Sequence, residues 1–86
     1  MKQNNSIYKF YLVRLSSTPI PQLVQYFNNE VGSHAWTTQR AAFDTALIEA
    51  LIYKGIDVSE IYDGHSIIFK RKITYEATSN NLVPIE

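Results

Sequence analysis

The side chains that could do acid–base or nucleophilic chemistry are few and scattered in this 86-residue sequence. Its two histidines are His34 and His65, and each has a serine beside it. Neither histidine has a second histidine at the spacing of helical metal ligands, and no third group is placed to orient an imidazole beside a serine. We therefore expect no metal site and no catalytic residue, and we interpret both histidines as loop or turn residues.

Motifs for cofactors are equally sparse. The chain has no cysteine, which excludes disulfides, thiolate nucleophiles and metal sites that need cysteine ligands. Its three glycines, Gly32, Gly55 and Gly64, are each explained by a helix end or a turn, so none is left for a phosphate-binding loop. The carboxylates are spread over a helix surface and a connection, where solvated acids normally lie. We expect a protein that is not an enzyme and that carries no cofactor.

Basic and aromatic residues form a second kind of candidate site. Eight basic and eight acidic side chains give a formal net charge of zero, which weakens long-range attraction to nucleic acid or to an anionic membrane. The charge is uneven, because residues 1–15 and 65–75 hold six of the basic residues and no acid. Aromatic rings that stack bases among cations that follow the phosphates can bind single strands. The alternative function is therefore single-stranded nucleic-acid binding by the basic, aromatic sheet strands, through Lys9, Tyr11, Arg14, Lys70, Arg71 and Lys72.

The favoured candidate site is an apolar surface on the second of two expected helices. At about 100° per residue, Ala41, Ile48 and Ile52 project away from the core-facing stripe of that helix. Two isoleucines one turn apart need a cover, and a small chain gains stability when it buries a second surface in an oligomer. The sequence favours a small non-catalytic protein–protein interaction module, which associates with itself as a homo-oligomer or docks on a partner through this face. The exposed face of the sheet could equally pair.

Two amphipathic helices are expected, at about 19–31 and 37–54. Thr18 is the expected N-cap of the first helix, and Gly32 and Gly55 supply the left-handed residue after each helix. Both segments carry an apolar stripe at helical spacing. The stripes are Ile20, Leu23, Val24, Phe27 and Val31 in the first helix, and Phe43, Ala46, Leu47, Ala50 and Leu51 in the second.

Three strands are expected in addition to these helices. Residues 7–15 are rich in aromatic and branched side chains on both faces, which is typical of an interior strand. The Asp63-Gly64 dipeptide predicts a two-residue hairpin turn that sets Tyr62 opposite His65. In that register Arg71 falls on the apolar face of the second hairpin strand. An alternative makes 57–60 a single helical turn and leaves a shorter hairpin.

The predicted fold class is α+β, in the order β-α-α-β-β, with a three-stranded antiparallel sheet and two helices on one face. Residues 1–76 form the predicted single domain, and 77–86, which lack periodicity, form a predicted flexible C-terminal tail. Lys9 and Arg14 interrupt the apolar run near the N-terminus, so we expect neither a signal segment nor a spanning helix there. The absence of cysteine and of such a segment favours a cytoplasmic protein that does not associate with membranes.

Overall fold

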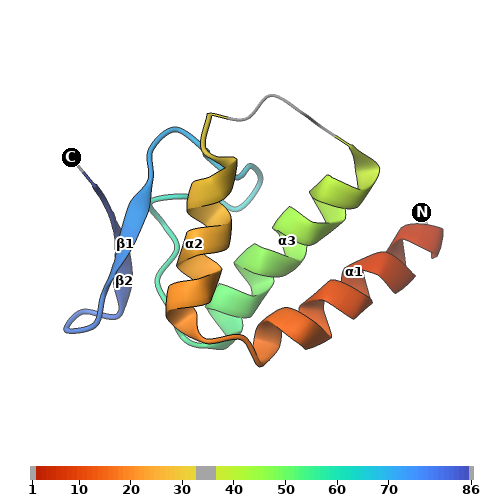
Figure 1. Cartoon of the computed structure of the whole chain (residues 1–86), viewed down its shortest axis with the longest axis horizontal. Helices are drawn as coiled ribbons and strands as arrows, with labels where there is room; N and C mark the ends of the chain where they lie inside the picture. Colours follow the sequence, from red (N-terminus) through yellow and green to blue (C-terminus); the bar gives the residue numbers. More distant parts are fainter. Residues whose placement is uncertain (1, 33–36, 86) are drawn as a thin grey trace.

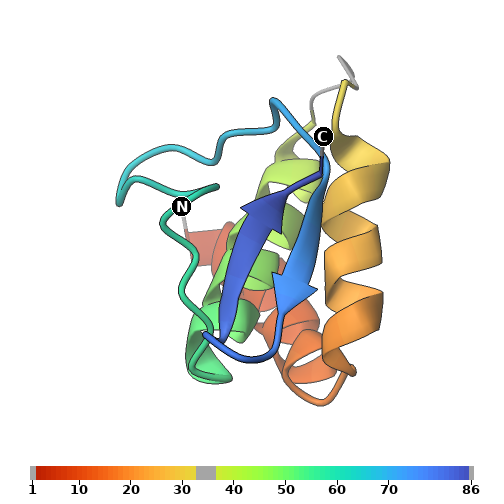
Figure 2. The same cartoon turned by 90° about the vertical axis from the view of Figure 1, so that its left-hand side faces the viewer.

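The computed structural model describes residues 2–32 and 37–85, and within them the chain forms three helices followed by a two-stranded antiparallel sheet. Figure 1 shows α3 in the middle of the molecule, between α1 and α2. Figure 2 shows the hairpin in front of α2 and α3, with α1 behind them. The predicted order β-α-α-β-β with a three-stranded sheet is therefore wrong. The elements are α1 (Lys2–Ser16), α2 (Ile20–Glu30), α3 (Thr38–Tyr53), β1 (Ile73–Glu76) and β2 (Asn81–Pro84).

The segment 7–15, predicted as a strand, lies inside the 15-residue helix α1. Its aromatic and branched residues favour a strand only weakly, because such preferences depend on what each face packs against. The same residues also hold a helical pattern, since Tyr8, Tyr11, Leu12 and Leu15 fall at i, i+3, i+4 and i+7. Leu15 is buried and the other three pack against the core. Packing of this stripe against α3 stabilises the helical conformation of residues 7–15.

Helices α2 and α3 confirm the two predicted helices. Thr37 is the N-cap of α3, and its hydroxyl accepts a hydrogen bond from the Arg40 backbone N–H at 3.0 Å. The predicted cap of α2 is wrong, because Pro19 occupies the N-cap position without a side-chain hydrogen bond. The Thr18 hydroxyl instead donates to the carbonyl of Arg14 at 2.8 Å, which satisfies an acceptor at the end of α1.

The predicted hairpin around Asp63-Gly64 is present only as a loop closed by a single antiparallel bridge. That bridge joins Tyr62 to Ile67, so the predicted pairing of Tyr62 with His65 is wrong. The side-chain oxygen of Asp63 accepts the backbone N–H groups of His65 and Ser66 at 2.8 and 2.7 Å, which widens the turn. Backbone bonds from residues 61 and 62 to the carbonyl of Val58 form a single helical turn before the loop, as in the alternative interpretation.

The sheet is made by a hairpin that sequence analysis divided between a strand and a tail. Strand β1 pairs with β2 from Ile73 opposite Pro84 to Glu76 opposite Asn81. Asn28 of α2 holds the edge of β1, because its amide donates to the Ile73 carbonyl and accepts the Ile73 N–H, both at 2.8 Å. Leu82 of β2 is fully buried in the core. Residues 81–84 therefore belong to the folded unit rather than to a flexible tail.

Candidate functional site

The outward side of α1 carries exposed apolar side chains. Ile7, Phe10 and Val13 lie within an arc of about 120° at the helical rotation per residue, opposite to the stripe that packs on the core. Phe10 is 58% exposed and Val13 is 71% exposed, while Ile7 is exposed to a smaller extent. We call these three residues the outer face of α1. Single exposed apolar residues are ordinary, but a contiguous group on one helix marks a candidate contact surface.

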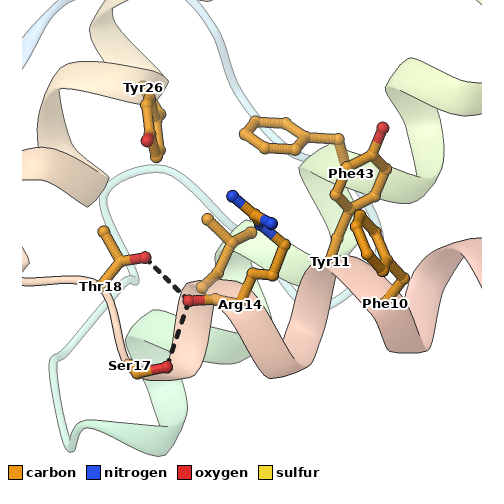
Figure 3. Close-up of a pocket in the computed structure, with 8 residues that line it drawn as sticks. Phe10, Tyr11, Arg14, Ser17, Thr18, Tyr26 and Phe43 are labelled. Atoms are coloured by element: carbon orange, nitrogen blue, oxygen red, sulfur yellow. Dashed lines mark hydrogen bonds between the residues drawn. The ribbon is translucent and has the colours of Figure 1, made fainter.

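A hollow of about 610 Å³ adjoins this face, where α1, α2 and α3 meet. Its walls are four rings in edge-to-face contact, from Phe10 to Tyr11, Tyr11 to Phe43 and Phe43 to Tyr26, with centroids 5.6, 5.2 and 5.8 Å apart. Such contacts hold rings in defined orientations, so the walls are set before anything binds. We call this the aromatic hollow (Figure 3), and it is lined by Phe10, Tyr11, Arg14, Leu15, Ser17, Thr18, Tyr26 and Phe43.

Arg14 is the charged residue in the lining of the aromatic hollow. Its guanidinium lies 5.5 Å from the centroid of the Phe10 ring, which is a cation–π contact. Of the four hydroxyls in the lining, those of Ser17 and Thr18 donate to the Arg14 carbonyl, and that of Tyr11 accepts a hydrogen bond from Gln39 Nε2. The hollow therefore presents aromatic surface, the Tyr26 hydroxyl and one cation. The apolar residues at helical spacing in 8–15 are the sequence signal that could have indicated this site. The strand-favouring residue types in the same segment led to the prediction of a strand instead.

The predicted partner-binding residues Ala41, Ile48 and Ile52 do not share one exposed face. Ile48 is 2% exposed and belongs to the hydrophobic core, whereas Ile52 is 43% exposed and Ala41 is half-buried. The reason is that α3 is covered on more than one side. Helix α1 packs along one side of α3, and the 62–67 loop lies beside Thr45 and Ile48 on another. The prediction that Ile48 faces outward is therefore wrong. Other parts of the same chain bury its side chain.

The predicted nucleic-acid-binding residues lie on two separate parts of the molecule. Lys9, Tyr11 and Arg14 are on α1, while Lys70, Arg71 and Lys72 precede β1, on the other side of α2 and α3 (Figures 1 and 2). The last three side chains are all exposed, and Lys70 and Arg71 border a small hollow together with Glu60. Arg71 thus lies outside the core. The expected continuous basic sheet is not formed, because half of its residues are helical.

The histidine prediction can be followed for one of the two residues. His65 is exposed in the 63–66 turn, whereas His34 lies outside the described residues. Hydrogen bonds from the backbone N–H groups of Ser66 and His65 lower the pKa of the Asp63 carboxyl that closes the turn. Over residues 2–32 and 37–85, no cluster of three or more His, Asp or Glu side chains could hold a metal ion.

A buried acid is the feature that sequence reasoning missed. Asp44 is 1% exposed, and neither of its carboxylate oxygens accepts a hydrogen bond within the described part of the chain. Glu30 lies beside it and is held by Arg40, whose Nε donates to Glu30 Oε1 at 2.8 Å. Burial, and then the contact with Glu30, raise the pKa of Asp44 to about 8. A contact between two carboxyl groups needs a proton, and the raised pKa of the buried Asp44 places that proton on Asp44.

Among the helices in the described ranges, none is long and apolar enough to span a membrane. No protein-family model, no curated protein and no solved structure matches the chain. The class that the structure itself defines is a small α+β domain of three helices and one hairpin. Because such layers host unrelated activities, the function has to be argued from the surface of α1 and the aromatic hollow.

Proposed function

We propose that this protein is a small non-catalytic, cytoplasmic protein–protein interaction module that docks on its partner through the outer face of α1 and the aromatic hollow. The observation that carries the proposal is the position of Phe10 and Val13. Both side chains are largely exposed on a helix whose opposite side already packs on the core. Burying them would remove apolar surface from water at about 25 cal/mol per Å², which favours association.

Aromatic side chains next to a pocket are the usual centres of binding energy in protein interfaces, which supports the choice of this surface. Phe10 belongs both to the outer face of α1 and to the wall of the aromatic hollow. A partner that covers Phe10 would therefore reach the hollow as well. Ile52 and Tyr53 at the end of α3 are also exposed, but no hollow is lined by either of them among those described.

The test is the double substitution Phe10→Glu with Val13→Glu. Each new carboxylate would have to be buried in the interface, so we expect partner affinity to fall at least about 100-fold, or a self-associated form to become monomeric. Native mass spectrometry measures self-association, and calorimetry measures affinity for an identified, purified partner. The thermal midpoint should stay close to that of the wild type, because both positions are exposed.

Ile52→Glu with Tyr53→Glu is the matched control, since it adds the same charge at exposed apolar positions on another helix. The proposal predicts that the control binds like the wild type. Equal binding by the Phe10 and Val13 variant would contradict it. So would a wild type that binds single-stranded oligonucleotides through Lys70, Arg71 and Lys72 and no protein at all, which is the outcome that the nucleic-acid alternative predicts.

A further inference from the structure

The guanidinium of Arg14 lies inside the aromatic hollow and points toward the rings of Phe43 and Tyr26 (Figure 3). Arg14 is in the last turn of α1. Arg14 is exposed, and its side chain lines the hollow beside the rings. The lining of the hollow thus combines a cation with aromatic side chains.

Within the described part of the chain, no hydrogen bond or ion pair engages this guanidinium. Within residues 2–32 and 37–85 its recorded contact is the cation–π contact with Phe10. The ion pair recorded there joins Arg40 to Glu30 instead. A guanidinium has five N–H donors in a planar fork, and the fork fits two oxygens of one carboxylate or phosphate. A ligand that brings such a group would complete the site.

We propose that the aromatic hollow binds a carboxylate of an acidic protein segment, and that a bulky apolar side chain next to that carboxylate packs against the rings. The carboxylate accepts two N–H bonds from Arg14, while the apolar side chain contacts Phe10, Tyr26 and Phe43. This inference rests on the proposed function and specifies the chemistry of the partner.

Charge complementarity favours an acidic segment. Helix α1 contains no Asp or Glu, and its basic residues include Lys9 and Arg14, both exposed. The residues that line the hollow include no acid either. An acidic segment would therefore meet attraction along the whole of α1, whereas a basic one would be repelled.

The size of the surface favours a segment over a second copy of the chain. A 15-residue helix is about 22 Å long and about 10 Å wide, so one side of it offers about 200 Å². A stable dimer buries about 800 Å² on each partner. A helix side with one adjoining hollow suits a short segment that inserts a single anchoring side chain.

The experiment uses three synthetic peptides as probes with the whole protein. The first alternates acids with apolar residues (Glu-Asp-Phe-Glu-Asp-Leu), the second replaces the acids by amides (Gln-Asn-Phe-Gln-Asn-Leu), and the third replaces the apolar residues by serine. Binding is followed by amide chemical shifts and by the Nε–H resonance of Arg14. We expect the first peptide to shift residues of the hollow and to bind about tenfold more tightly than either of the others.

Substitution of Arg14 supplies the second measurement. Arg14→Gln should weaken the first peptide about tenfold, and Arg14→Lys should weaken it less, because an ammonium keeps the charge but loses the two-point geometry. Arg71→Gln is the matched control, since Arg71 is equally basic and exposed but lies outside the hollow. The Arg71→Gln variant should bind the first peptide with the affinity of the wild type.

Three results would overturn the inference. They are equal binding of the acidic and amide peptides by the wild type, unchanged affinity in Arg14→Gln, and tighter binding of an oligonucleotide or of anionic lipid vesicles in the hollow. The peptide comparison needs no substituted protein, so it stays decisive even if a variant misfolds. If Phe10→Glu with Val13→Glu abolishes partner binding while Arg14→Gln does not, the inference fails and the proposed function stands.

Discussion

Asp44 shows how a single residue links burial to pH. Its carboxyl is enclosed between α3, the end of α2 and the 65–69 segment, and the charged or titratable groups around it are Glu30, Arg40 and His65. Within residues 2–32 and 37–85 no donor contacts this carboxyl, so an ionised carboxylate would be unsatisfied there and would repel Glu30. The protonated acid can donate to Glu30, so the native state holds a proton that the unfolded chain releases at ordinary pH.

We predict that the stability of the protein falls as the pH rises from about 4 to about 8. The pKa of Asp44 is 3.8 when unshifted and about 8 in the native state, so within this window only the native state binds the proton. The contribution of Asp44 to the free energy of unfolding is fully present below pH 4, falls by at most about 1.4 kcal/mol per pH unit, and levels off above pH 8. Urea unfolding at each pH measures it.

Asp44→Asn should flatten this profile and be the more stable protein at pH 8, because the amide can donate to Glu30 without titrating. His65 lines the same hollow as Asp44, so His65→Gln is introduced into the reference protein and into both variants, which then differ only at the residue tested. Asp57→Asn is the control. A backbone N–H of Ser59 lowers the pKa of Asp57, so its effect is confined to acidic pH. Identical profiles for wild type and Asp44→Asn would contradict the assignment.

At the scale of elements, α3 is a helix covered on two sides by its own chain. A helical wheel separates one apolar stripe from the rest, and by that criterion Ile48 faces outward. A central helix needs more than one apolar side, and Ile48 lies on the second one. Because residues 7–15 are predicted as a strand, the sequence assigns burial of Ile48 to a partner. In the structure, α1 and the 62–67 loop cover α3 instead.

Ile48→Glu should therefore unfold or strongly destabilise the protein, rather than release a partner from a folded chain. A glutamate at this buried position has no cation to pair with in the core cluster, and we expect a loss of at least about 3 kcal/mol. Ile52→Glu, one turn away and exposed, should cost less than about 1 kcal/mol. Thermal melting by circular dichroism compares the two. Similar melting temperatures would show that Ile48 is not in the core.

For the whole molecule, the C-terminal strand completes the core. The turn before β2 is joined to the end of α3, since the Asn80 side chain donates to the Gly55 carbonyl at 2.7 Å and accepts a hydrogen bond from the Tyr75 hydroxyl. Leu82 of β2 is fully buried in the core cluster. A chain of this length buries a limited core, so the last strand contributes a large share of it.

Leu82→Ala should lower the free energy of unfolding by about 2–5 kcal/mol, which is the usual cost of truncating a fully buried leucine. In a domain this small, each kcal/mol shifts the melting temperature by about 4–8 °C. Thr78→Ala in the exposed turn is the control and should melt like the wild type. A mobile tail would predict no effect from either substitution, and calorimetry distinguishes the two outcomes.

The sequence by itself determined the features that depend on near neighbours. The apolar stripes of α2 and α3, the cap at Thr37 and the presence of a turn at Asp63-Gly64 follow from local spacing and local hydrogen bonds. The cap expected at Thr18 and the expected pairing of Tyr62 with His65 are wrong.

Only the tertiary structure decided the remaining features. Residues 7–15 satisfy a strand and a helix pattern at once, and contact with α3 selects the helix because it buries Tyr8, Leu12 and Leu15 on one side. Strand β2 pairs with β1 although residues 77–86 show no periodic pattern of apolar residues. The aromatic hollow needs side chains from three helices, so no local pattern contains it. Long-range packing selects among local patterns of similar free energy. In this chain it determines both that α1 is a helix and where the candidate site lies.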